Sequence, residues 1–250
     1  MKKRIIPCLD IRDGRVVKGT NFENVADVAN PIDLAKQYDV DQADTLFLLD
    51  ITGKDKEQFL QLVKDIKAAI SMPLYVGGGI RSVADVEAAL AAGANKVSIT
   101  SAAIDNPDLI KNATETCGTD TVVLSIDAKK VADNKWQAFT SGGKKDSGLD
   151  VIEWAKRGEQ LGASEILLNS IDADGVKEGY DIELNKAVAE AVNIPVIASG
   201  GAGEMEHFTS VLSDGKANAA LAASVFHYDE INITDLKEYL LNFDIPVEEI

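Results

Sequence analysis

Two aspartates end apolar runs of similar make-up. Asp10 closes the run IIPCLD and Asp127 closes the run VVLSID. If both runs are strands of one parallel sheet, their carboxyl ends meet at one edge and the two carboxylates face the same opening. Two carboxylates in different surroundings can divide the roles of general acid and general base. An aspartate at a strand end can instead cap the next turn, but the matching positions of this pair favour catalysis.

Glycine-rich turns occur twice. Residues 76–82 are VGGGIRS and residues 198–204 are ASGGAGE, and each follows a proline and a short apolar run. Glycine lets the backbone approach a ligand closely, and a helix that starts after it offers free N–H groups to an anion. Neither turn fits the Walker or the dinucleotide-binding pattern. We therefore expect two phosphate sites in one opening, suited to a substrate that is phosphorylated at both ends.

The expected substrate-binding residues lie in these turns, at other strand ends and in the segments that follow them. Strand ends at residues 96–100 and 219–222 are followed by hydroxyl-bearing residues, and residues 174 and 175 follow the strand expected at 165–169. The full expected set is Lys18, Asp50, Gly79, Thr100, Ser101, Asn169, Asp174, Gly175, Ser199, Gly200, Gly201, Ala223 and Ser224.

An internal repeat relates the two halves of the chain. The identical pairs are Pro73 with Pro195, Gly78 with Gly200, Gly79 with Gly201 and Gly93 with Gly215 at a separation of 122, then Ser101 with Ser224 at 123. A half-barrel leaves open sheet edges, whereas two halves joined edge to edge leave none. We therefore expect half-barrels over about residues 1–120 and 121–250. The alternative is the weak self-similarity of any α/β barrel.

Strand-like and helix-like segments alternate along the chain. Short β-branched or apolar runs predict strands over residues 5–10, 45–50, 74–77, 96–100, 121–127, 165–169, 196–199 and 219–222. Segments with helical periodicity lie between them, and several end at glycine. The pattern predicts an α/β protein with a (β/α)8 TIM barrel, as a single domain over residues 1–250.

Two segments are longer than ordinary connections between a strand and a helix. They cover residues 11–30 and 128–150, after the first and the fifth expected strands. Loops of this length in a compact domain are usually lids or binding elements. Both follow strand ends on the face where barrel enzymes carry out chemistry, so we expect them at the opening.

Composition excludes several classes of function. The 250 residues carry a net charge of −16, which disfavours binding to nucleic acid or to a membrane surface. No apolar stretch reaches the ~18 residues of a membrane span, and the start MKKRIIPCLD meets an aspartate too early for a signal peptide. Two cysteines fit a reducing compartment, so we expect a cytoplasmic protein. Two histidines and an incomplete calcium-loop fragment, DADG at residues 172–175, lead us to expect no metal and no cofactor.

Several segments together carry a family resemblance. They are KRIIPCLDIRDGRVVKGTNFEN, VGGGI, KVSI, SIDAK, DGVKEGYD, IASGGAGEMEHF and ALAASVFH, spread over nearly the whole chain. They resemble the cyclase subunits of imidazole glycerol phosphate synthases, which belong to histidine biosynthesis. The resemblance implies a (β/α)8 barrel that takes ammonia from a separate glutaminase subunit in a heterodimer. It also implies that this ammonia cleaves and cyclises a bis-phosphorylated phosphoribulosyl formimino carboxamide ribonucleotide (PRFAR), giving imidazole glycerol phosphate and an aminoimidazole carboxamide ribonucleotide.

The resemblance also assigns roles to single residues. Asp10 and Asp127 match the family's catalytic aspartates, and Lys18 matches a lysine that contacts the substrate. The residues that match the two phosphate sites are Gly79 with Ser101, and Gly175, Gly201 and Ser224. Ammonia is implied to enter from the opposite, amino-terminal face through a charged ring, matched here by Arg4, Lys96 and Glu165.

The chain departs from the family pattern at two of these positions. The fourth member of the entrance ring is commonly glutamate, but Thr45 stands there. Thr100 stands where asparagine is usual, beside one phosphate site. These departures leave the chemistry of the two aspartates intact, and they bear on the ring and on one phosphate contact.

Two other functions fit the same pattern. One is the isomerase that opens a phosphoribosyl ring one step earlier in the same pathway, which would share the barrel, the repeat and the phosphate sites. The block IPCLD followed by GRVVKG favours the cyclase. The other is a barrel without catalytic activity that serves as a scaffold, and the presence of both Asp10 and Asp127 argues against it.

Overall fold

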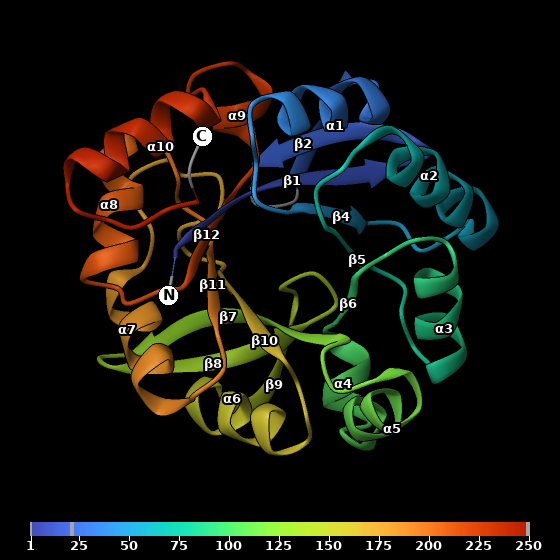
Figure 1. The fold of residues 1–250 in the computed structure, drawn as a ribbon. Helices are drawn as coiled ribbons and strands as arrows, with labels where there is room; N and C mark the ends of the chain where they lie inside the picture. Colours follow the sequence, from blue (N-terminus) through green and yellow to red (C-terminus); the bar gives the residue numbers. More distant parts are fainter. Residues whose placement is uncertain (1, 21–22, 249–250) are drawn as a thin grey trace.

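Strands and helices alternate around a closed barrel, seen along its axis in Figure 1. The computed structural model describes residues 2–20 and 23–248, with the side chains of residues 18–20 and 23–28 outside the description. Within these residues, eight parallel strands form the barrel, which confirms the predicted (β/α)8 fold. The barrel strands are β1 (Arg4–Arg12), β4 (Leu46–Asp50), β5 (Leu74–Gly77), β6 (Lys96–Ile99), β7 (Val122–Ala132), β10 (Glu165–Ser170), β11 (Val196–Ser199) and β12 (Ala219–Ala222).

Helices form the outer layer of the barrel (Figure 1). They are α1 (Pro31–Val40), α2 (Lys56–Ala69), α3 (Val83–Ala91), α4 (Ser101–Asp105), α5 (Asp108–Cys117), α6 (Val151–Gln160), α7 (Ile182–Ala191), α8 (Met205–Ser213), α9 (Ser224–His227) and α10 (Ile233–Asn242). None of the helices in the described part of the chain is long and apolar enough to cross a membrane.

The first and last strands close the barrel. β12 lies parallel to β1, with Arg4 opposite Ala219 and Pro7 opposite Ala222. β10 pairs in parallel with β7 on one side and with β11 on the other. Each barrel strand therefore has a parallel neighbour on both sides, and the unpaired edges that invite aggregation are absent from this ring of strands.

Alternation along the strands separates two apolar layers. On β1, Ile5 and Leu9 belong to the large core between the strands and the helices, whereas Ile6 and Cys8 belong to a smaller cluster inside the barrel. The interior cluster also holds Phe47, together with residues from β5, β7, β10, β11 and β12. Because side chains alternate along a strand, Asp10, two positions beyond Cys8, faces the barrel interior near the carboxyl end of β1.

The two long segments are not irregular loops. The chain forms β2 (Arg15–Thr20) with β3 (Glu23–Ala29), and β8 (Lys135–Thr140) with β9 (Lys145–Asp150). β1 and β7 run on past the barrel rim and pair with β2 and β8 in antiparallel registers. Alternating runs such as KWQAFT favour strands, and tight turns with positive φ at Asp13, Gly14 and Asn134 reverse the chain. The predicted lengths were right, but these elements are sheet extensions rather than loops.

Candidate active site

A cavity of about 730 Å³ opens at the carboxyl ends of the barrel strands. Its walls include Cys8, Ser98 and Ser125 from inside the barrel, and the short segments that follow the strands. Of the residues predicted to bind or transform the substrate, those that line this cavity are Asp10, Asp50, Gly79, Thr100, Ser101, Asp127, Asn169, Asp174, Gly175, Ser199, Gly200, Gly201, Ala223 and Ser224. Lys18 lies in β2, and its side chain is outside the described residues.

The two aspartates face this cavity from strands β1 and β7. The Cys8 thiol lies 3.8 Å from Oδ1 of Asp10. Burial raises the pKa of Asp127 to about 6; the hydrogen bond from Asn169 lowers it, and the negative charge of Asp174 raises it. A carboxyl group with this pKa can hold a proton near neutral pH and release it, as a general acid must.

The glycine turns have matching backbones. Gly78 and Gly200 both adopt φ of +89°, and the glycine that follows each of them is also left-handed. A Cβ at Gly201 would meet the carbonyl oxygen of Gly179, and Gly179 donates its own N–H to the carbonyl of Gly201 at 2.8 Å. The turn therefore needs glycine both for its conformation and for a close backbone approach.

The next barrel strand after each glycine turn, β6 or β12, is followed by a residue of a second matched pair, Thr100 and Ala223. Thr100 and Ala223 precede the short helices α4 and α9 with similar backbone angles, φ −115° and ψ −98° for Thr100, φ −125° and ψ −77° for Ala223. Each helix begins with a serine that lines the cavity, Ser101 and Ser224. A hydroxyl and backbone N–H groups are thus presented at both sides of one opening, which suits two anionic groups.

The turn between β8 and β9 reaches the first of these serines. The backbone N–H of Ser141 donates to the hydroxyl of Ser101 at 3.1 Å, and Ser141 and Gly142 line the cavity. Ser141, Gly142 and Gly143 all have positive φ, which turns the chain back toward the barrel. One of the two predicted binding elements therefore lies at the opening.

Asp50 has a local role besides lining the cavity. Its Oδ1 accepts from the backbone N–H groups of Thr52 and Gly53 and from the Thr52 hydroxyl, each at 2.9 Å. Asp50 therefore caps the turn after β4. This is the structural role that stands as the alternative to a catalytic role for an aspartate at a strand end.

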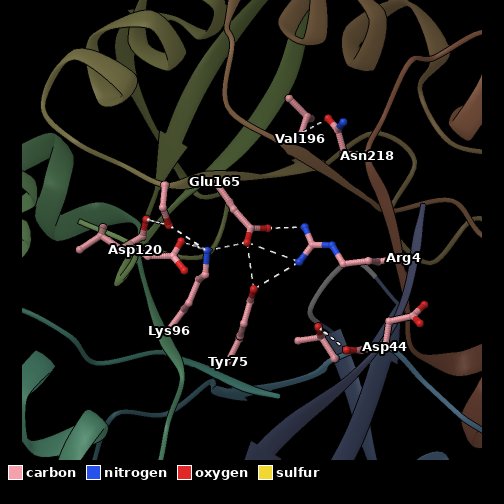
Figure 2. Close-up of polar contacts among 11 residues, drawn as sticks. Arg4, Asp44, Tyr75, Lys96, Asp120, Glu165, Val196 and Asn218 are labelled. Carbon is pink, nitrogen blue, oxygen red and sulfur yellow. Dashed lines mark hydrogen bonds and ion pairs between the residues drawn. The ribbon is translucent and has the colours of Figure 1, made fainter. Parts of the chain in front are cut away.

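A polar cluster closes the opposite, amino-terminal end of the barrel (Figure 2). Arg4 and Lys96 both pair with Glu165, at 2.5 Å and 2.8 Å, and Figure 2 shows Glu165 between the two cations. The Tyr75 hydroxyl donates to Glu165 at 2.9 Å and accepts from Arg4 at 3.2 Å. Burial would raise the pKa of Glu165, but its bonds to Arg4 and Lys96 outweigh burial and hold that pKa below its usual range.

The fourth predicted member of this ring, Thr45, has a different hydrogen-bond partner. Thr45 is buried, and its hydroxyl donates to the carbonyl of Asp44 rather than to a charged side chain. Tyr75 and the exposed Asp120, which pairs with Lys96 at 2.5 Å, contact the ring instead. Three of the four predicted entrance residues are therefore joined by ion pairs, whereas among the described residues the Thr45 hydroxyl makes no hydrogen bond to them.

Sequence reasoning missed several residues at these two sites. They are Tyr75, Arg81, Asp120, Ser125, Ser141 and Gly142. Strand alternation does place Ser125 on the same face as Asp127, two residues before it on β7, but it was not included among the expected site residues. Arg81 could have been found from its position two residues after Gly79, in the glycine turn. The place of Ser141 at the cavity depends on the fold of the β8–β9 hairpin, and the residues around it in the sequence do not indicate a site.

The comparisons with known proteins agree with this geometry. A family model described as histidine biosynthesis protein matches residues 4–232. The imidazole glycerol phosphate synthase subunit HisF of Oceanobacillus iheyensis is 53% identical over 249 residues, covering 99% of this chain and 98% of that protein. Proteins of the same name from Endomicrobium trichonymphae and Dehalococcoides mccartyi are each 50% identical over 99% of this chain, and 95% and 98% of their own lengths are covered.

Both the family model and the relatives match almost the whole barrel, including the strands that carry the two aspartates. The resemblance drawn from the sequence segments is therefore confirmed. The chain belongs to the histidine biosynthesis protein family, in the group formed by the HisF subunits of imidazole glycerol phosphate synthase.

Proposed function

We propose that this chain uses ammonia to convert PRFAR into imidazole glycerol phosphate, an aminoimidazole carboxamide ribonucleotide and water. The observation that carries the proposal is the position of Asp10 and Asp127 in one cavity, between two glycine turns with matching backbones. A molecule with a phosphate at each end can lie across such an opening, with its reacting centre beside the carboxyl groups. Membership of the HisF group makes the chain an enzyme of histidine biosynthesis.

The chemistry requires protons to be moved in both directions. Ammonia attacks the ribulosyl carbonyl and loses a proton, while the carbonyl oxygen gains protons and leaves as water. The nitrogen introduced from ammonia then attacks the formimino carbon and closes the ring, and the carboxamide nucleotide departs from that carbon with a proton on its nitrogen. We assign the role of acid to Asp127, because its raised pKa of about 6 leaves part of it protonated near neutrality and a bound phosphorylated substrate raises it further. Asp10, across the cavity, is assigned the role of base.

The substrate's phosphates are assigned to the two glycine turns. Gly79 and Ser101 form one site; Gly175, Gly201 and Ser224 form the other. The remaining expected residues, among them Thr100, Asn169 and Ala223, would position the part of the substrate that lies between its two phosphates, or would hold the two aspartates in place. Lys18 keeps the role of an anion contact from β2.

We further propose a glutaminase partner at the amino-terminal end of the barrel. The relatives are named as subunits of a synthase, which supports a complex. The ring of Arg4, Lys96 and Glu165 lies at the first residues of their strands, far from the cavity that holds the aspartates. Ammonia made by a partner on this face would pass the ring and enter the barrel interior.

The division into half-barrels and the cytoplasmic location are part of the same proposal. β5 and β11 each have four residues and α3 and α8 each have nine, with bounds 122 positions apart. This correspondence supports halves over about residues 1–120 and 121–250. Neither Cys8 nor Cys117 forms a disulfide within the described residues, and reduced cysteines are the state expected in a reducing compartment.

The test supplies the full chain with PRFAR and ammonium salt and follows the two products. We expect turnover by the unaltered chain, and a loss of at least about 100-fold in kcat for both Asp10→Asn and Asp127→Asn. Near-normal turnover in either variant would remove that residue from the mechanism. A chain that acts on the isomerase's substrate without ammonia, and leaves PRFAR unchanged, would contradict the proposal.

A further inference from the structure

The charge of the cavity does not suit its proposed substrate. Among the described side chains that line it, the acids are Asp10, Asp50, Asp105, Asp127 and Asp174, and the one cation is Arg81. A substrate with two phosphate groups brings up to four further negative charges, which these carboxylates repel. Backbone N–H groups offer only partial charges in return. A cation in the cavity wall therefore contributes strongly to the binding of a phosphate group next to it.

The guanidinium of Arg81 is available to a ligand. Arg81 lies two residues after Gly79 and directly before Ser82, the residue that caps α3. Its backbone N–H donates to the carboxylate of Asp85 at 2.9 Å, which fixes the turn without using the side chain. The side chain is exposed, lines the cavity and makes no ion pair within the described part of the chain.

At the second glycine turn, none of the described residues that line the cavity is a cation. At the repeat separation of 122, the position equivalent to Arg81 is Gly203. A Cβ at Gly203 would meet the carbonyl oxygen of Lys177, so the backbone packing there leaves no room for a side chain. The ammonium group of Lys177 is itself paired with Glu230 at 2.6 Å. The two glycine turns therefore have matching backbones but unequal charge.

We propose that Arg81 is a substrate-binding residue that makes the Gly79–Ser101 site the stronger of the two phosphate sites. The inference rests on the proposed function, because it takes both turns to bind the ends of one substrate. A guanidinium can give two parallel hydrogen bonds to the oxygens of a phosphate monoester, and it remains charged at any working pH. The inequality gives the substrate a direction in the opening: one phosphate end is held by charge and backbone together, and the other by backbone and hydroxyl groups.

The test resolves the two sites with inorganic phosphate as the probe. The amide signals of Gly79, Ser101, Gly201 and Ser224 are followed by NMR in the full chain as phosphate is added. In the unaltered protein we expect Gly79 and Ser101 to respond at lower phosphate concentration than Gly201 and Ser224. In Arg81→Gln we expect the Gly79–Ser101 response to weaken by roughly tenfold, while that of Gly201 and Ser224 is unchanged.

Two further variants serve as controls. Lys54→Gln removes the same charge from an exposed residue that follows β4 at the same end of the barrel but does not line the cavity, and it should leave both responses within about twofold. Arg81→Lys keeps the charge without the paired hydrogen bonds and should fall between the unaltered protein and Arg81→Gln. Equal responses for Arg81→Gln and Lys54→Gln would overturn the proposal, as would equal weakening at both turns.

A kinetic measurement separates this proposal from the proposed function. With ammonium salt as the nitrogen source, Arg81→Gln should raise the KM for PRFAR by about tenfold and change kcat by less than about threefold. A loss in kcat with KM unchanged would overturn the binding role. If the unaltered protein does not consume PRFAR at all, the proposed function fails, and the phosphate titration still decides whether Arg81 strengthens the first site.

Discussion

The side-chain amide of Asn169 donates a hydrogen bond to Oδ1 of Asp127 at 3.2 Å, across the register in which β10 and β7 pair these two residues. The amide oxygen of Asn169 accepts from the Ser199 hydroxyl at 3.1 Å, so a third strand orients the amide group. This bond favours the charged form of Asp127, but burial outweighs it and the pKa rises to about 6. Three adjacent strands thus set the charge state of the proposed acid.

Replacing Asp127 should stabilise the fold at neutral pH. A carboxyl with a folded-state pKa of about 6 binds a proton in the native state at pH values where the unfolded chain has released it, so stability falls as pH rises from about 4 to 6. At pH 8 we expect Asp127→Asn to gain up to about 3 kcal/mol in the free energy of unfolding, and the gain should shrink toward pH 4. Denaturant unfolding at several pH values measures this.

The control for this experiment is Asp133→Asn, which removes a charge from an exposed residue in the turn before β8. We expect its effect to stay within about 0.5 kcal/mol at every pH. A destabilised Asp127→Asn at pH 8 would mean that the carboxylate has a favourable partner there and that its native-state pKa is not raised.

Gly79 and Gly201 provide a paired comparison of the two turns. Both have positive φ, +68° and +109°, so alanine is strained at either position. Among the described residues, a Cβ at Gly79 would meet Gly53 alone within 4 Å, at 3.5 Å, whereas at Gly201 it would overlap the backbone of Gly179. We expect Gly79→Ala to cost about 1–2 kcal/mol in the free energy of unfolding and Gly201→Ala clearly more. Chemical denaturation of the two variants checks the order, and equal costs would show that the backbone near Gly179 yields easily.

Much of the barrel could be predicted from the sequence because its strands are short, buried and followed by helices with clear periodicity. The expected strands at residues 74–77, 196–199 and 219–222 agree with the structure at both ends. Asp10 and Asp127 could be placed at one opening because strand alternation and barrel closure together leave few other positions. The roles of the residues that line the cavity remain predictions.

Contacts between distant segments could not be predicted in this way. The hydroxyl of Tyr75 meets Arg4 and Glu165 only because β1, β5 and β10 surround one axis, and nothing near Tyr75 in the chain signals a charged neighbour. Residues 11–30 and 128–150 were expected as loops because their polar composition hid the strand alternation. Their pairing depends on β1 and β7 continuing beyond the rim, which is a tertiary property.

The buried pair of Lys237 and Asp44 joins the last helix to the first strands. Lys237 Nζ lies 2.6 Å from Oδ1 of Asp44, both side chains are at most 5% exposed, and Oδ2 of Asp44 accepts from the backbone N–H of Ile5. Burial raises the pKa of Asp44, and the bond to Lys237 opposes this. We expect Lys237→Met to cost about 3–5 kcal/mol at pH 7, because it leaves a buried carboxylate without its cation.

Asp44→Asn and the double variant Lys237→Met/Asp44→Asn complete a double-mutant cycle for this pair. The double variant should recover part of the loss, because no unpaired charge remains in the core. Free energies of unfolding for the four proteins give the coupling energy. If Lys237→Met costs no more than the double variant, the two residues do not act as a pair.

Tyr75 combines the polar ring with the apolar interior of the barrel. Its aromatic ring packs edge to face on Phe47, with centroids 5.8 Å apart, and the ammonium group of Lys96 lies 5.7 Å from its centroid. Tyr75→Phe keeps this packing and removes the hydrogen bonds to Glu165 and Arg4, so we expect it to lower the free energy of unfolding by about 1–2 kcal/mol.

The same variant tests whether ammonia from a partner enters through the charged ring of Arg4, Lys96 and Glu165. If it does, turnover driven by glutamine and the glutaminase should change in Tyr75→Phe, while turnover driven by ammonium salt stays within about twofold. Tyr180→Phe, which removes a buried hydroxyl bonded to the carbonyl of Leu221, is the control for loss of a phenol group. Equal effects of Tyr75→Phe on both rates would show that Tyr75 acts through the stability of the barrel and has no part in ammonia entry.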